Sequence, residues 1–130
     1  MGQGYLIDTN TTIDYLSDKL PAKSAEFIGK IDSQLSVISR MELLAWPNAT
    51  EEQLKVLEAF VGSSNIFSLS EPVIIESIRI RKTYRIKLPD AIIAATALVF
   101  DLTLITLNTV DFKNISGLKL INSHKLAPVK

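Results

Sequence analysis

The sequence predicts an α/β fold of three layers, α/β/α, with a central, mostly parallel sheet of about five strands. Short apolar stretches with strand character recur along the chain, at 5–8, 35–38, 66–69, 102–107 and 118–121. Segments with helical signals separate most of them, and helical connections of about ten residues or more join parallel strands. The first stretch, Tyr5-Leu6-Ile7, is apolar on both faces, which is typical of a strand buried in a parallel sheet.

Start signals mark the helices expected between these strands. They are Asn10 as cap of a helix through Asp18, the capping-box pairs Ser39/Glu42 and Thr50/Gln53, and a first-turn proline at Pro72 and at Pro89. The last link, 108–117, is too short for a full crossover helix, so the final strand is expected to join less regularly.

Length and composition indicate one soluble domain covering residues 1–130, because 47% of the residues are apolar. Fourteen basic and fourteen acidic residues cancel, so net charge gives no sign of a nucleic-acid partner. The chain shows no signal peptide, and its longest apolar stretch, 91–100, is too short to cross a membrane. We therefore expect a cytoplasmic protein without membrane contact.

Several kinds of catalysis are excluded by the residues that the chain lacks. Without cysteine there can be no disulfide, thiolate zinc site or cysteine nucleophile. The single histidine, His124, cannot form a histidine pair and makes a serine–histidine triad improbable on chemical grounds. None of the five glycines forms a phosphate-binding loop after a strand. Carboxylates therefore remain as the candidate catalytic groups.

Four acids stand where strands end or the adjoining helices begin: Asp8, Glu42, Asp90 and Asp111. Because the strand ends of one sense share one edge of a parallel sheet, these acids can converge there. Clustered carboxylates repel one another unless a cation or protons neutralise them, and Mg²⁺ or Mn²⁺ suits oxygen ligands. Metal-assisted phosphodiester hydrolysis is the reaction most consistent with such an edge.

Each acid also has a purely structural interpretation. Asp8 and Asp111 can be turn residues, Glu42 fits the third helical position of a capping box behind Ser39, and Asp90 favours a helix dipole. That last effect is worth only about 0.3–1 kcal/mol. All four structural interpretations would have to hold together by coincidence. The four acids as a set are therefore stronger evidence for a metal site than any one of them alone.

The stretches 6–16, 39–44, 89–112 and 117–122 together resemble PIN-domain proteins of the VapC toxin type, over nearly the whole chain. The most specific part is the block 89–97 followed by Thr106-Leu107-Asn108 and Asp111-Phe112. The resemblance implies a PIN-like fold and a Mg²⁺-dependent ribonuclease, with Mn²⁺ as a substitute. It also implies the toxin of a toxin–antitoxin pair, a homodimer, and an antitoxin that threads a segment over the active site.

Carried over by position, the resemblance makes Asp8, Glu42, Asp90 and Asp111 the catalytic, metal-binding quartet, with Asp8 and Asp90 as direct ligands. Four further residues would orient these ligands or water, namely Thr9, Asn10, Thr106 and Asn108. Related proteins carry either Asn or Asp at the position of Asn108, which leaves open whether one or two metal ions bind.

A basic strip leads toward the proposed metal site, with no acid between Glu76 and Asp90. Its cations are Arg79, Arg81, Lys82, Arg85 and Lys87. They could steer RNA phosphates, and Tyr84 could stack a base. A solvated helix face explains the same pattern equally well. Trp46 can anchor an interface or belong to the core.

Three other functions compete with a toxin nuclease. A phosphorylated receiver module would need an acid pair after the first strand, whereas Asp8 is followed by Thr9 and Asn10. A non-catalytic α/β module that only binds a protein is disfavoured by the four acids. A housekeeping PIN-type nuclease without an antitoxin has the same site residues, so only its genetic partner can separate it from a toxin.

Overall fold

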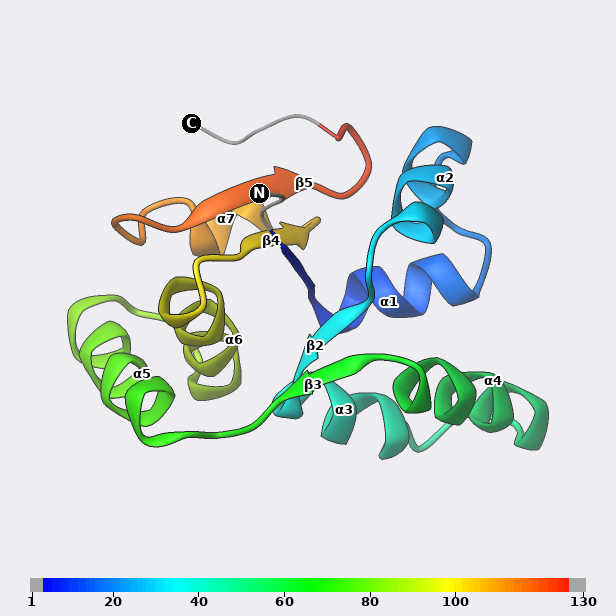
Figure 1. The fold of residues 1–130 in the computed structure, drawn as a ribbon, viewed down its shortest axis with the longest axis horizontal. Coiled ribbons are helices and arrows are strands. Elements are labelled where there is room, and N and C mark those ends of the chain that lie inside the picture. Colours follow the sequence, from blue (N-terminus) through cyan, green and yellow to red (C-terminus); the bar gives the residue numbers. More distant parts are fainter. Residues whose placement is uncertain (1–3, 127–130) are drawn as a thin grey trace.

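Strands and helices alternate in the computed structural model, which describes residues 4–126 (Figure 1). In chain order they are β1 (Tyr5–Ile7), α1 (Thr9–Leu16), α2 (Ala22–Lys30), β2 (Gln34–Ser36), α3 (Val37–Leu44), α4 (Glu51–Gly62), β3 (Asn65–Phe67), α5 (Glu71–Thr83), α6 (Leu88–Val99), β4 (Thr103–Thr106), α7 (Thr109–Phe112) and β5 (Lys119–Asn122). The one-turn helix α7 occupies the link that is too short for a full crossover.

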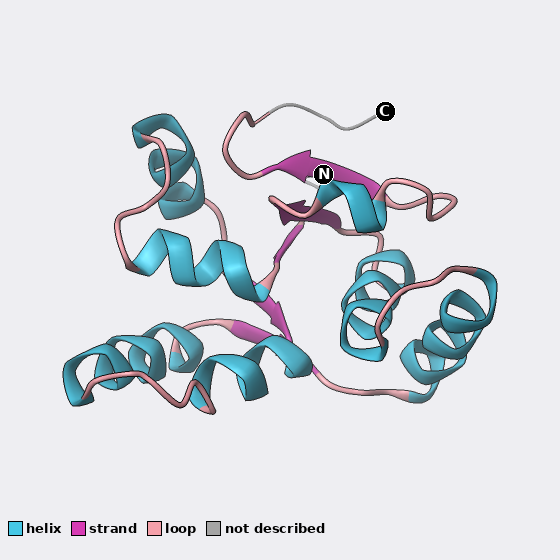
Figure 2. Ribbon diagram, turned by 180° about the vertical axis from the view of Figure 1, so that it is seen from behind, coloured by secondary structure: helices cyan, strands magenta, loops and turns pink. Residues whose placement is uncertain are grey.

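The strand pairs in residues 4–126 are all parallel and form two ladders, β1-β4-β5 and β2-β3. A side chain joins the ladders where the backbone does not, since Gln34 Nε2 donates a hydrogen bond to the Tyr5 carbonyl oxygen over 3.1 Å. The five strands lie centrally with helices on both sides (Figures 1 and 2). This confirms the predicted three-layer fold with a mostly parallel sheet.

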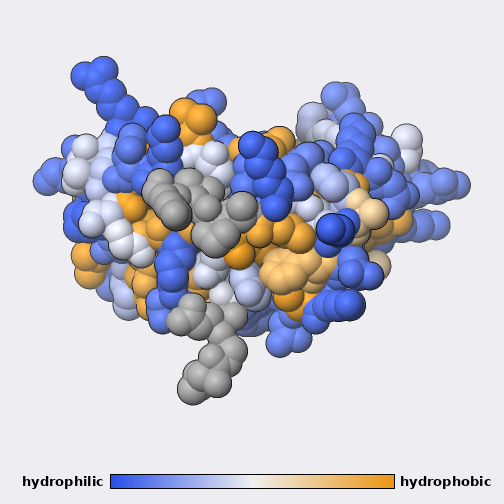
Figure 3. Space-filling model, turned by 90° about the horizontal axis from the view of Figure 1, so that it is seen from above, coloured by the Kyte–Doolittle hydropathy of each residue, from blue (hydrophilic) through white to orange (hydrophobic). Residues whose placement is uncertain are grey.

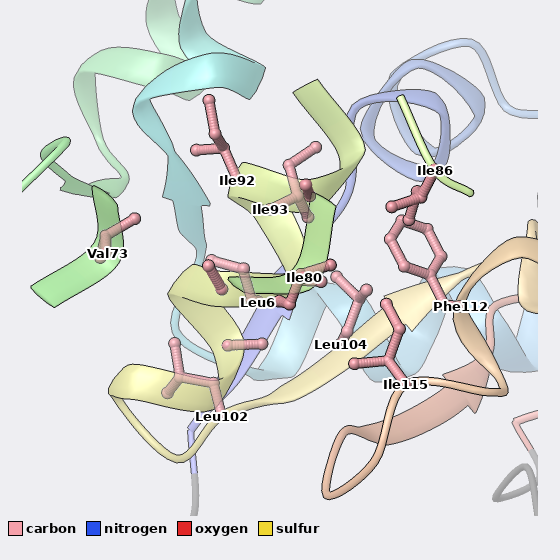
Figure 4. Packing of buried hydrophobic residues seen from close by; sticks show 14 of the residues in the cluster. Leu6, Val73, Ile80, Ile86, Ile92, Ile93, Leu102, Leu104, Phe112 and Ile115 are labelled. Atoms are coloured by element: carbon pink, nitrogen blue, oxygen red, sulfur yellow. The ribbon is translucent and has the colours of Figure 1, made fainter. Parts of the chain in front are cut away.

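Side chains of β1 and β4 alternate between two hydrophobic cores. Leu6 lies opposite Leu104 and both face a core with α5, α6 and α7, shown in Figure 4. Ile7 lies opposite Ile105, and both belong to a second core with α1 to α4. Buried cores on both faces explain why these strands are apolar on both faces.

Three of the predicted helix signals are confirmed. Thr50 and Gln53 form a complete capping box, with hydrogen bonds of 2.9 and 3.1 Å. Pro72 and Pro89 stand in the first turns of α5 and α6. At these positions the missing proline N–H needs no partner within the helix.

Two predicted caps are wrong, and helices α2 and α7 were not predicted. Asp8, not Asn10, caps α1, because the chain already turns into the helix directly after β1. Ser36, not Ser39, caps α3, so Ser39 and Glu42 lie inside that helix. Helix α2 follows Pro21, which offers no capping side chain, and therefore carried no start signal.

No helix within residues 4–126 is long and apolar enough to cross a membrane. Figure 3 shows the face over β5, where hydrophilic side chains project around the rim and hydrophobic residues form patches between them.

Candidate metal-dependent active site

One cavity of about 460 Å³ is lined by all four predicted acids. Asp8 follows β1, Glu42 lies in α3, Asp90 in the first turn of α6, and Asp111 in α7. The remaining lining residues are Thr9, Asn10, Ile13, Trp46, Lys87, Ile93, Asn108 and Phe112. The parallel topology therefore gathers acids that are up to about a hundred residues apart at one edge of the sheet.

Asp8 is held in place from both carboxylate oxygens. The backbone N–H of Thr11 donates to Oδ1 over 2.8 Å, and the Thr106 hydroxyl donates to Oδ2. The residue is buried, with 6% of its surface exposed. Burial raises the pKa of Asp8 above its usual value, and the hydrogen bonds from Thr106 and Thr11 oppose that rise.

Thr106 links Asp8 to Asn108, another residue that lines the cavity, although Thr106 itself does not line it. While its hydroxyl donates to Asp8, the same oxygen accepts a hydrogen bond from the Asn108 N–H over 3.0 Å. The Asn108 side chain in turn donates to Asp111 Oδ2 over 2.9 Å. One network thus positions two of the four acids through two residues predicted to orient ligands.

Glu42 is positioned by the start of α1. The hydroxyl of Thr9 donates to Glu42 Oε1 over 2.6 Å and lies 3.0 Å from Ser39 Oγ. Glu42 is exposed, so this contact with a neighbouring helix, and not burial, fixes where its carboxylate lies. The capping-box interpretation of Glu42 is wrong, since α3 begins at Val37.

The pKa of Asp90 is affected by the other three acids that line the cavity. Partial burial raises the pKa of Asp90, and the charges of Glu42, Asp111 and Asp8 raise it further, against the opposing effect of Lys87. Asp90 therefore lies close enough to each of the other three carboxylates to be affected by its charge. A bound cation would relieve this repulsion.

The chemistry of the donor set fits a hard divalent cation, which prefers carboxylate oxygens. The hydrogen bonds described above engage one oxygen each of Glu42 and Asp111, which leaves the second oxygen of each for a metal. Among residues 4–126, no three Asp, Glu or His side chains form a ready-made metal site. The carboxylates would therefore have to draw together around an ion.

Without metal, the raised pKa values predict an unusual pH dependence of stability. A folded state that binds protons on Asp8 and Asp90 more tightly than the unfolded chain loses stability as pH rises through the raised pKa values. Because Asp90→Asn removes one of these charges, we expect the variant to gain about 0.5–1 kcal/mol relative to the unmodified chain as the pH rises above the ordinary range of an aspartate carboxyl, the size of partly screened charge interactions.

Urea unfolding in a chelating buffer at several pH values measures this difference. The matched control is Asp18→Asn, because Asp18 is exposed, lies outside the cavity, and has a left-handed backbone that asparagine tolerates. A stability difference for Asp90→Asn that stays constant with pH would show that the acids do not repel one another.

The basic strip lies next to this cavity. Arg81, Lys82, Arg85 and Lys87 line an adjoining cavity of about 440 Å³, and Lys87 lines the acidic cavity as well. Arg79 pairs with Glu76 on the same helix, so it is committed to a local contact. Tyr84 lines the same cavity, its hydroxyl accepts a hydrogen bond from the Ser116 N–H over 3.0 Å, and its partly buried ring packs against the first core, so base stacking by Tyr84 stays a prediction.

Sequence reasoning missed the apolar wall of the site. Ile13, Ile93 and Phe112 line the cavity but carry no chemical signal. Spacing alone could have indicated Ile13, which lies one helical turn after Asn10. Trp46 stood out in the sequence, but its place in the cavity wall comes from the way in which α3 ends beside α1.

A sequence model of the PIN domain family matches residues 5–118. A toxin–antitoxin complex from Klebsiella pneumoniae contains a chain with 32% identity and a TM-score of 0.75, with 92% of this chain and 98% of that chain covered. VapBC-1 from nontypeable Haemophilus influenzae has 26% identity and a TM-score of 0.78, with 93% and 98% covered.

DNA-bound VapBC from Salmonella typhimurium shares the fold, with a TM-score of 0.83, 23% identity, and 94% and 99% of the two chains covered. No curated protein sequence matches this chain significantly. The family match covers most of the chain, and the solved relatives are matched along almost their whole length. This chain therefore belongs to the PIN domain family and is VapC-like in its fold and sequence.

Proposed function

We propose that this chain, as one PIN domain of residues 1–130, is a Mg²⁺-dependent endoribonuclease that acts as the toxin of a toxin–antitoxin pair. The observation that carries the proposal is the convergence of Asp8, Glu42, Asp90 and Asp111 on one cavity, where their charges repel. PIN domain toxins are nucleases, and PIN nucleases generally use divalent metal ions. RNA as the substrate and Mg²⁺ as the ion, with Mn²⁺ as a substitute, are the finer parts of the proposal.

The four acids would hold the ion, which when bound supplies neutralisation of phosphate charge and a water of lowered pKa. Hydrogen bonds within the chain fix the orientation of the carboxylates that would hold the ion. Thr106 and the Thr11 N–H hold Asp8 in one orientation, Asn108 holds Asp111, and Thr9 holds Glu42. Hydrogen bonds of this kind orient metal ligands and raise their basicity. Lys87 at the cavity wall would meet a substrate phosphate.

The partners that we propose are an antitoxin and a second copy of the chain. The solved relatives from Klebsiella pneumoniae and Haemophilus influenzae are a toxin–antitoxin complex and a VapBC complex. For a homodimer, Ile75 and Ile78 offer apolar surface one helical turn apart on α5, with 59% and 54% of their surfaces exposed.

Inducible expression of the chain, with and without the small reading frame beside its gene, tests the proposed role. Alone, the chain should arrest growth and degrade cellular RNA, and co-expression should restore growth. Asp18→Asn should remain toxic and Asp90→Asn should not. Metal-dependent RNA cleavage by the purified protein without any effect on growth would indicate a housekeeping nuclease, and the absence of both would overturn the proposal.

A further inference from the structure

The acidic cavity is the middle of three adjoining hollows. On one side it shares Lys87 with the cavity lined by residues 81–87. On the other side it shares Ile13 and Trp46 with a groove of about 610 Å³ between α1 and α4. A polynucleotide cut at the acids must extend beyond the cut phosphate in both directions, so these two hollows are the surfaces that its flanks would meet.

The groove beyond Trp46 differs in chemistry from the basic side. Its apolar surface comes from Ile13, Leu16, Val56 and Leu57, and its polar lining from Ser17, Lys19, Glu52 and Gln53. A single lysine beside a glutamate offers little attraction for phosphates. An apolar surface with hydrogen-bonding groups around it suits a nucleobase, which has a flat apolar face and a polar edge.

Trp46 stands at the junction of the groove and the acidic cavity. It lies two residues beyond the end of α3, is partly buried against the second core, and lines both hollows. Its backbone is held in a turn, since its N–H bonds to the Leu43 carbonyl and its carbonyl accepts from the Ala49 N–H. Within residues 4–126 its indole N–H makes no hydrogen bond, so both the ring and its donor can meet a ligand.

The other aromatic residues near the acids cannot take this role. Phe112 lines the cavity but is 1% exposed and packs in the core beside Ile86 (Figure 4). Tyr84 lines the basic hollow and not the groove, and its hydroxyl accepts a hydrogen bond from the Ser116 N–H. Trp46 is therefore the aromatic side chain that lines both the acidic cavity and the groove without being fully buried.

We infer that Trp46 stacks a nucleobase next to the cut phosphate. The inference rests on the proposed nuclease function and deepens it. Bases of a single strand stack on aromatic side chains, whereas a duplex keeps its bases stacked on one another. The strand would run from the basic residues 81–87, which meet its phosphates, across the acids to Trp46.

Trp46 is the only tryptophan of the chain, so its fluorescence reports on this position alone. In the Asp90→Asn variant, which should bind but not cut, a single-stranded RNA of about ten nucleotides should quench the emission in a saturable manner. Two probes of equal length are the controls, an abasic strand and a fully paired duplex, and both should leave the emission almost unchanged. Fluorescence anisotropy of dye-labelled strands measures binding independently.

Kinetics of two substitutions complete the test, because Trp46→Phe keeps an aromatic face and Trp46→Leu keeps only apolar bulk. For single-stranded RNA we expect Trp46→Leu to raise KM about tenfold or more with kcat nearly unchanged, and Trp46→Phe to stay within about threefold. Thermal melting of both variants shows whether the core contacts of Trp46 are kept.

Unchanged emission on a strand that anisotropy shows to be bound, or equal KM values for the phenylalanine and leucine variants, would overturn the inference while leaving the nuclease intact. Emission that responds only to a protein partner would overturn it too and would assign the groove to that partner. If the unmodified chain cuts no RNA and the Asp90→Asn variant binds none, the proposed function itself fails.

Discussion

Asp90→Asn should fold, yet cut RNA at least about 100-fold more slowly than the unmodified chain in the presence of Mg²⁺ or Mn²⁺. Residues that only support metal ligands already cost about 10–100-fold when they are changed, and Asp90 is proposed as a direct ligand. Asparagine keeps the size and one oxygen of the side chain but removes the charge. Burial and the repulsion from the other acids both raise the pKa of Asp90, and both costs disappear with the charge, so the fold should not suffer.

Melting curves with and without millimolar Mn²⁺ separate loss of metal from loss of fold. A ligand that binds only the folded state raises the melting temperature, so Mn²⁺ should stabilise the unmodified chain and Asp18→Asn but have much less effect on Asp90→Asn. Full cleavage activity in Asp90→Asn would defeat its assignment as a ligand. Melting curves of the unmodified chain that Mn²⁺ leaves in place would remove the chemical basis of the proposed site.

Thr106→Val should cost both stability and activity, although Thr106 does not line the cavity. The substitution keeps the shape of the side chain but deprives the buried Asp8 carboxylate of a donor and the Asn108 N–H of its acceptor. Leaving such groups without partners costs about 1–3 kcal/mol of unfolding free energy. Because Asp8 is then less well oriented, cleavage should fall about 10–100-fold.

Thr106→Ser is the matched control, since it keeps the hydroxyl and loses only a methyl group. Urea unfolding and cleavage rates with saturating Mn²⁺, measured for both variants, provide the comparison. The serine variant should behave nearly as the unmodified chain. If valine and serine give the same rates, the hydroxyl does not position Asp8, and the network through Asn108 to Asp111 has no catalytic role.

Signals that act over a few residues were readable in the sequence. The apolar runs predicted five strands, and first-turn prolines and the Thr50/Gln53 pair predicted helix starts, because each of these effects depends only on neighbours in the chain. The sequence did not show which of two nearby capping residues would cap a helix. Asp8 and Asn10 are both good caps two residues apart, and the point where β1 leaves the sheet decides between them.

The sequence by itself determined the fold class and the acidic residues that could meet at one sheet edge, since parallel topology follows from alternating strands and helices. Only the tertiary structure decided how those acids are held. The Thr9 contact with Glu42 and the Thr106 contact with Asp8 join residues 33 and 98 positions apart. Trp46 likewise became part of the cavity wall only where α3 ends beside α1. Such contacts depend on packing across the whole domain, and no local pattern of residues encodes them.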